Sequence, residues 1–365
     1  MYATREDIRK AAGTLITCGF SGLSIDAELK EVLREVQPSG LILFKRNIES
    51  PEQVAELGKE LKLYRPENPL CLSVDQEGGR VARIREPATV WPPMHQLGEI
   101  GDPELCYRFA QALGREVRAM NFDIDYSPVL DVNSNPDNPI IGDRAFSQSP
   151  EITGKCGAAV VKGLHSVGVA AVGKHFPGHG DTDLDSHIAL PKVSHELSRL
   201  REVEWPPFKA AVDAGLGAIM TAHVVIESID ENVPATFSKD AMDFLRDELN
   251  FQGVIMSDDL EMKAVADRYE AQEMAILGMK AGLDHYLVCE KPEMILDFYR
   301  ALIRAVEREY VSHESIINAA KRTEAWLQRF YQPPVDATKV NEWVGCREHQ
   351  ALAKDIDTRY RMLSM

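Results

Sequence analysis

The sequence predicts an α/β protein of the (β/α)8 TIM-barrel class, built as a single domain with a C-terminal extension. Eight short apolar runs recur along the 365 residues, and segments with helical spacing separate them. Most of the runs are continuously apolar, as expected for parallel strands that are buried on both faces. A doubly wound open sheet is the runner-up, but it usually has fewer strands, and no GxGxxG follows an early run.

The predicted elements alternate in chain order. The apolar runs expected to form strands are residues 14–20, 40–44, 70–74, 122–129, 170–173, 218–222, 253–256 and 285–289. Segments whose apolar residues recur at helical spacing lie between them, for example 51–63, 103–120, 150–167, 200–214, 240–249, 264–281 and 293–309.

The composition changes near Gln332, so we expect residues 1–332 to form the barrel domain and 333–365 to form a C-terminal segment. Pro333 and Pro334 interrupt the preceding helix. Residues 349–363 again have helical spacing. This helix is expected to pack on the barrel or on a partner subunit.

The composition predicts a soluble, cytoplasmic protein. The formal net charge of −16 argues against nucleic acid as a partner, because an acidic chain repels phosphate backbones. Six cysteines without a CxxC pair indicate a reducing compartment. The N-terminus lacks a signal-peptide pattern, and no apolar run approaches the roughly 18 residues that a membrane span requires.

The stretch 174–191, KHFPGHGDTDLDSHIALP, contains three histidines and three aspartates. An apolar run precedes it, and the Pro-Gly-x-Gly sequence that starts at Pro177 interrupts both helix and strand. We therefore expect a long polar loop at the end of a buried strand. Loops held by a rigid scaffold often carry the chemistry of a protein.

Polar residues follow seven of the eight runs, as a barrel with an active site at the carboxyl ends of its strands requires. A set of segments on different strands predicts one shared pocket, although any single one could be a solvated loop charge. The segments are 45–47, 75–80, 131 with 143–144, 174–175, 223, 257–259 and 290.

One residue of this set, together with two residues of the 174–191 stretch, suggests a catalytic pair. Asp258 directly follows an apolar run, and since neighbours on a strand point to opposite sides, only one of Asp258 and Asp259 should face the pocket. Asp185 and His187 are close enough in sequence to form a carboxylate–imidazole dyad, a general acid/base. A histidine acid opposite a carboxylate nucleophile would permit glycosyl transfer by double displacement.

Other interpretations of these residues remain open. Three histidines and three aspartates in one loop would suit a divalent metal, but there is no HExxH, and Ser186 stands where an EF-hand loop needs glycine. His175 and His179 could instead brace the loop. Asp75 could bind sugar hydroxyls or pair with a nearby arginine.

Four motifs, VDQEGGRV, IGDRAF, KHFPGHGDTDLDSH and GVIMSDDLEM, resemble those of glycoside hydrolase family 3. The resemblance covers residues from about 10 to 330 and is specific to the bacterial β-N-acetylglucosaminidases of peptidoglycan recycling, the NagZ type. It implies a TIM barrel and a retaining mechanism through a covalent glycosyl-enzyme. Asp258 would be the nucleophile, and His187 the acid/base with Asp185 as its partner.

The resemblance also implies a substrate. The expected substrate is terminal β-linked GlcNAc on a muropeptide sugar, with no metal, no organic cofactor and no membrane or nucleic-acid partner, in a monomer or homodimer. Another family 3 sugar specificity, phosphorolysis of GlcNAc, a metal-dependent hydrolase and a non-catalytic sugar-binding protein remain the alternatives. The residues that would hold the sugar are Asp75, Arg144, Lys174 and His175.

Overall fold

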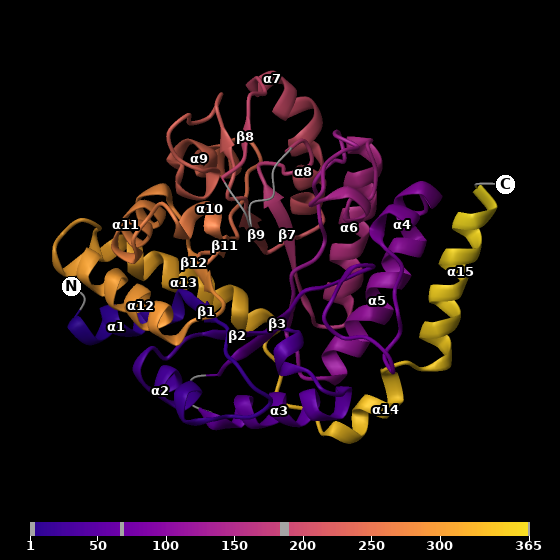
Figure 1. The fold of residues 1–365 in the computed structure, drawn as a ribbon, viewed down its shortest axis with the longest axis horizontal. Coiled ribbons are helices and arrows are strands. Elements are labelled where there is room, and N and C mark those ends of the chain that lie inside the picture. The colour runs from indigo at the N-terminus through magenta and orange to yellow at the C-terminus, as the bar shows by residue number, and fades with distance from the viewer. Residues whose placement is uncertain (1–3, 66–68, 183–189, 364–365) are drawn as a thin grey trace.

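The computed structural model describes residues 4–65, 69–182 and 190–363. Eight parallel strands close into a barrel in the order β1-β12-β11-β9-β7-β6-β3-β2, with helices around it (Figure 1), which confirms the predicted class. The barrel strands are β1 (Ile16–Cys18), β2 (Gly40–Leu43), β3 (Cys71–Val74), β6 (Ile124–Asp125), β7 (Ala170–Phe176), β9 (Ala218–Thr221), β11 (Val254–Asp259) and β12 (His285–Val288).

Each predicted run overlaps one of these strands, but three ends differ. The fourth strand is much shorter than expected, in keeping with Pro128, which has no amide for a ladder bond. The fifth continues through Lys174 and His175, so the predicted polar loop begins only after Phe176. The seventh includes Asp258. The polar residues Lys174, His175 and Asp258 therefore lie on strands and not in loops.

Five helices match the prediction closely: α3 (Pro51–Tyr64), α5 (Pro103–Ala119), α6 (Pro150–Ser166), α9 (Lys239–Asp247) and α12 (Pro292–Glu307). Two predicted helices are interrupted. Residues 200–214 form a π-helical turn (Leu200–Glu204) before α8 (Trp205–Asp213), because Pro206 and Pro207 cannot donate regular helical hydrogen bonds. Residues 264–281 divide into α10 (Lys263–Ala266) and α11 (Ala271–Ala281).

Further helices lie outside the segments given above, among them α1 (Arg5–Thr14), α2 (Ala27–Glu35) and α4 (Met94–Ile100). Helix α13 (His313–Phe330) is the helix expected before Pro333 and Pro334. Helix α1 includes Thr14, which had been assigned to the first strand. No helix in the described part of the chain combines the length and the apolar character that crossing a membrane would require.

The core has two layers because successive strand residues face opposite sides of the barrel wall. On β2, Leu41 and Leu43 belong to the layer between strands and helices, whereas Ile42 belongs to the barrel interior. Phe330 of α13 joins the interior cluster. The strands are thus fixed on both faces, which makes their carboxyl ends rigid supports for side chains.

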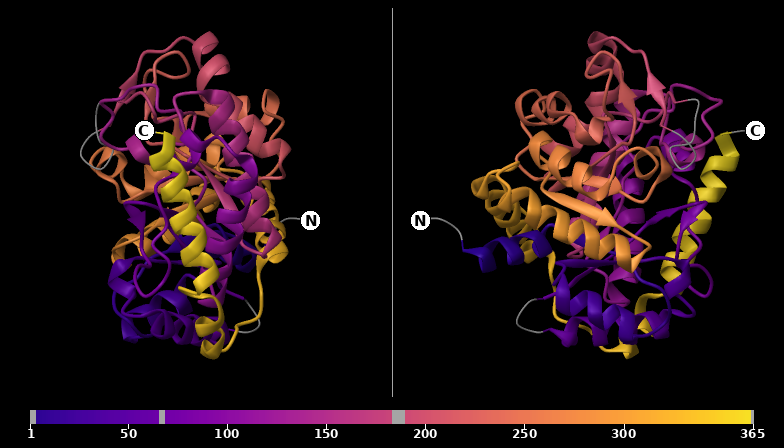
Figure 2. Two further views of the ribbon diagram at one scale, coloured as in Figure 1. Left: turned by 90° about the vertical axis from the view of Figure 1, so that its right-hand side faces the viewer. Right: turned by 60° about the vertical axis from the view of Figure 1, so that its left-hand side comes forward.

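The chain after α13 runs across the amino-terminal end of the barrel and then up one side. Buried Lys62 binds the Gln332 carbonyl at 3.0 Å, and Asn121 binds the Val335 carbonyl at 3.1 Å. After α14 (Val340–Trp343), helix α15 (Arg347–Leu363) lies beside α4 and α5 at the edge of the molecule (Figures 1 and 2). Its His349 is fully buried, with Nδ1 2.9 Å from Glu116 Oε1.

Candidate active site

A cavity of about 510 Å³ opens at the carboxyl ends of the strands. Its apolar lining includes Ile42, Tyr126, Met220 and Leu287. The predicted site residues Asp75, Arg144, Lys174, His175 and Asp258 all line it, together with Glu77, Arg80, Arg83, His179, Asp259, Glu261, Lys263 and Glu290. Most of the polar segments that follow the strands therefore share one pocket.

One wall of the cavity is a buried network of carboxylates and cations. Lys174 Nζ lies 2.8 Å from Asp75 Oδ1 and 2.7 Å from Glu77 Oε1. Arg144 binds Glu77 with two parallel hydrogen bonds of 2.9 and 2.8 Å, the bidentate geometry that an arginine fork favours. Arg83 Nη2 lies 3.0 Å from Asp75 Oδ2. Each carboxylate oxygen of this network thus has a cationic partner.

The carboxylates of this wall are held by a tight hairpin, β4 (Gln76–Gly78) and β5 (Val81–Ala82). Gly78 and Gly79 have φ values of 104° and 55°, and a side chain on Gly78 would meet a main-chain oxygen at 2.6 Å. The buried Asp125 accepts from the Gln76 amide at 2.9 Å, and the Gln76 side chain accepts from the Arg83 amide at 2.9 Å. These bonds fix both the start and the end of the hairpin.

The network keeps its carboxylates ionised. Burial alone would raise the pKa of the Glu77 carboxyl, but Arg144 and Lys174 lower this pKa to about 2. Burial acts on Asp75 in the same direction, and Lys174 and Arg83 overcome it, so the pKa of Asp75 also lies well below its ordinary value. The two carboxylates raise the pKa of Lys174 above its ordinary value in spite of its burial.

His175 is oriented from behind by the buried Asp131. Its Nδ1–H donates to Asp131 Oδ2 at 2.7 Å, which leaves Nε2 directed to the pocket side, 3.5 Å from Arg144 Nη2. Asp131 also accepts from the His179 amide at 2.7 Å. Burial lowers the pKa of His179 to about 4, and its Nδ1 lies 2.7 Å from the Thr182 hydroxyl. These contacts agree with a bracing role for His179.

Asp258 presents a different environment at the end of β11. Its Oδ1 accepts from the Asp259 amide at 2.8 Å, and no cation pairs with it among the residues that the structure describes. Asp258 and Asp259 both border the cavity, but the Asp259 carboxyl accepts hydrogen bonds from the main-chain amides of Glu261 and Cys289. The expectation that only one of the two carboxyls faces the pocket therefore stays a prediction. The register against β12 shifts between Met256 and Asp259, so strict alternation does not hold there.

Two predicted segments do not line the cavity. In the 3-10 helix Lys45–Asn47, Asn47 donates to the carbonyls of Phe20 and Gly22, and the chain turns away from the pocket. His223 is buried behind the wall, where its Nε2–H donates to the Asp259 carbonyl at 3.0 Å.

Residues 183–189 of the predicted loop, among them Asp183, Asp185 and His187, lie outside the described residues. Glu77, which the sequence analysis did not single out, is the centre of the charged wall. Its position two residues after Asp75, hence on the same side of an extended segment, was the signal that could have identified it.

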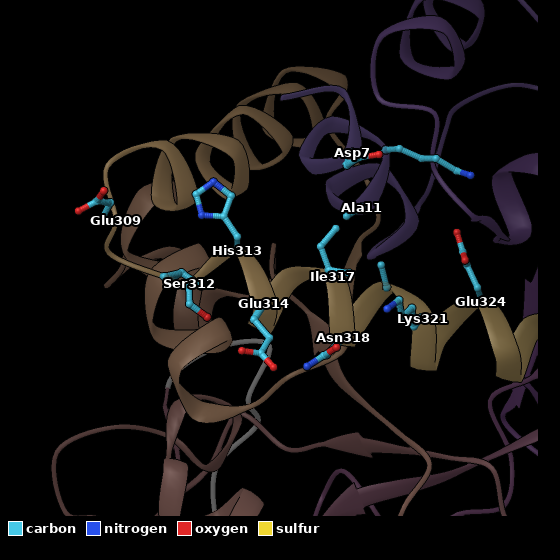
Figure 3. Close-up of a pocket in the computed structure, with 13 residues that line it drawn as sticks. Asp7, Ala11, Glu309, Ser312, His313, Glu314, Ile317, Asn318, Lys321 and Glu324 are labelled. Carbon is cyan, nitrogen blue, oxygen red and sulfur yellow. The ribbon is translucent and has the colours of Figure 1, made fainter. Parts of the chain in front are cut away.

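The described residues include no group of three side chains suited to bind a metal ion. A second hollow, of about 970 Å³, lies between α1 and α13, away from the strand ends (Figure 3). Asp7, His313, Glu314 and Lys321 lie along it as separate side chains. It lacks the buried pairing of charges that distinguishes the pocket at the strand ends.

Known proteins are similar to this chain in sequence and in fold. A family model described as the glycosyl hydrolase family 3 N terminal domain matches residues 8–325. A beta-hexosaminidase of Idiomarina loihiensis is 38% identical over 322 residues, which cover 84% of this chain and 96% of that protein.

Solved structures of family 3 enzymes have the same fold as this chain. A family 3 beta-N-acetylglucosaminidase from Paenibacillus sp. str. FPU-7 has 37% identity and a TM-score of 0.90, over 96% of this chain and 68% of that one. NagZ from Neisseria gonorrhoeae, solved with N-trifluoroacetyl-D-glucosamine, has 29% identity and a TM-score of 0.78, over 95% of this chain and 98% of that one. The chain belongs to glycoside hydrolase family 3 and is an enzyme that hydrolyses glycosides.

Proposed function

We propose that the chain is a retaining exo-β-N-acetylglucosaminidase with Asp258 as its nucleophile. The observation that carries the proposal is the contrast between the carboxylates of the pocket. Cations occupy both oxygens of Asp75 and of Glu77, whereas Asp258 has only an amide partner among the described residues. Asp258 is therefore the carboxylate of the three with an oxygen available to attack an anomeric carbon.

The charged wall would hold the sugar. Asp75 can accept from two sugar hydroxyls through its remaining lone pairs, and Lys174 and Arg144 can donate to hydroxyl or carbonyl oxygens. His175, fixed by Asp131, adds a ring nitrogen, and Arg83 joins the set through its contact with Asp75. Relatives named beta-hexosaminidase, and a NagZ solved with an N-acylated glucosamine, favour GlcNAc as the sugar.

The reaction would proceed in two displacements. Asp258 attacks the anomeric carbon and forms a glycosyl ester, while His187, paired with Asp185, protonates the departing oxygen. The neutral His187 then takes a proton from water, which attacks the same carbon and releases the sugar. The natural substrate in this proposal is terminal β-linked GlcNAc on a muropeptide sugar.

The test compares an aryl β-N-acetylglucosaminide with the matching β-glucoside. The wild type should cleave the GlcNAc compound and release β-GlcNAc as the first product. Asp258→Ala should lose at least about 10⁴-fold in kcat, because no covalent path remains, while GlcNAc binding persists. The same assay with phosphate should give no sugar 1-phosphate.

Each failure has its own meaning. Preference for the glucoside would overturn the sugar assignment and leave the nucleophile. An Asp258→Ala enzyme with wild-type turnover would overturn the nucleophile. Formation of GlcNAc 1-phosphate would replace hydrolysis with phosphorolysis.

A further inference from the structure

The carboxyl end of β11 contains an extra residue relative to its neighbour β12. Met256 is paired with His285, and Asp259 is paired with Leu287, so three steps along β11 match two steps along β12. Such a bulge re-aims side chains and is common beside active sites. Here it lies next to Asp258.

Side chains of β11 bind main-chain amides at this irregularity. The Ser257 hydroxyl accepts from the Leu287 amide at 3.2 Å. Asp259 Oδ1 accepts from the Cys289 amide, just after β12, at 3.2 Å, and from the Glu261 amide in the following turn at 3.1 Å. The Asp259 carboxyl therefore connects the ends of two strands and the turn between β11 and α10.

The main chain of Asp259 is tied to the site as well. Its amide donates to Asp258 Oδ1 at 2.8 Å, and its carbonyl accepts from His223 Nε2–H at 3.0 Å. The peptide groups on both sides of Asp259 are thus held. The orientation of the Asp258 carboxylate depends on the first of them.

We propose that Asp259 is a positioning residue whose carboxyl closes the β11 bulge and so fixes the amide that orients Asp258. The proposal rests on the proposed role of Asp258 as the nucleophile, and Asp259 itself does not contact the sugar in it. A displacement of about 1 Å in a reacting group can cost about 100-fold in rate. That is the size of effect expected when the carboxyl is removed.

Substitutions at residue 259 can separate the position of the acceptor oxygen from the charge of the carboxyl. Burial raises the pKa of Asp259 to about 7, and the nearby Glu261 and Asp258 carboxyls act in the same direction. The two amides require only an acceptor oxygen at the position of Oδ1. An asparagine supplies that oxygen without charge, whereas a glutamate keeps the charge but carries it one methylene further.

The experiment compares Asp259→Asn, Asp259→Glu and Asp259→Ala with the wild type. We expect Asp259→Ala to lose about 100-fold in kcat on the aryl β-N-acetylglucosaminide. Asp259→Glu should lose nearly as much, and Asp259→Asn should recover most of the rate. The Kd for GlcNAc and the KM for the aryl glycoside should stay near the wild-type values in all three variants, because Asp259 is not part of the charged wall that would hold the sugar.

The outcomes separate this proposal from the proposed function. If the wild-type enzyme does not cleave the aryl β-N-acetylglucosaminide, the proposed function itself is overturned. An active wild type, an inactive Asp258→Ala and an unaffected Asp259→Ala would overturn only the role of Asp259. Equal losses in Asp259→Asn and Asp259→Ala would show that charge and not position matters, which also overturns it. Should Asp259→Ala fail to fold, the Asn–Glu comparison decides alone.

Discussion

Replacing Glu77 by glutamine tests whether the charged wall contributes to folding. The side chain is 2% exposed and pairs with both Arg144 and Lys174. Glu77→Gln keeps the shape and one acceptor oxygen but removes the charge. Lys174 then keeps only Asp75 as an anionic partner, and Arg144 loses its ion pair.

The expected loss in the free energy of unfolding follows from the pKa of Glu77. Lowering this pKa from 4.5 to about 2 corresponds to about 3 kcal/mol in favour of the folded state. The loss of one partner from a buried ion pair typically costs 3–5 kcal/mol. Both arguments predict that Glu77→Gln lowers the free energy of unfolding by about 3 kcal/mol at pH 7.

Denaturant titration of wild type and variant at pH 7 measures this difference, with the slope m checked for constancy. The matched control is Glu151→Gln, which removes an exposed carboxylate paired with Lys155 and should leave the midpoint unchanged. Because the folded-state pKa of Glu77 is the lower one, its contribution is present above pH 4.5 and is lost as the pH falls towards 2. Equal midpoints for Glu77→Gln and Glu151→Gln would refute the reasoning.

Three further predictions test other parts of the molecule. His187→Ala should slow glycosides with poor leaving groups by at least about 100-fold more than activated aryl glycosides, and equal losses in rate assays would contradict an acid role. Lys62→Met should lower the free energy of unfolding by about 3 kcal/mol and leave kcat unchanged, since Lys62 pairs with Asp123 at the opposite end of the barrel. Dialysis against a chelator should leave turnover unchanged, and a loss restored by a divalent ion would favour a metal-dependent hydrolase.

The strands could be predicted because barrel strands that are covered on both faces are continuously apolar. Their ends could not. Lys174 and His175 have the composition of a loop, yet they continue β7, because their main chain pairs with neighbouring strands while their side chains are paired in the site.

The site could be predicted as a set of segments but not as a set of contacts. Topology brings Asp75 and Lys174 together although 99 residues separate them. The sequence could not decide which arginine pairs with Asp75. The β4–β5 hairpin directs Arg83 to Asp75 and Arg80 to Asp143, and that choice depends on the turn at Gly78.

The binding wall acts as one unit, which affects how its mutants should be interpreted. Glu77 connects Arg144 to Lys174, and Lys174 connects Glu77 to Asp75, so removing any member leaves at least one buried charge with a vacant partner position. The loss in a single variant then contains the cost of that unpaired charge as well as the lost sugar contact. A second substitution in the network removes part of this cost, so paired losses are smaller than their sum. Asp258 has no cationic partner among the described residues, and its substitution reports on the chemical step without this penalty.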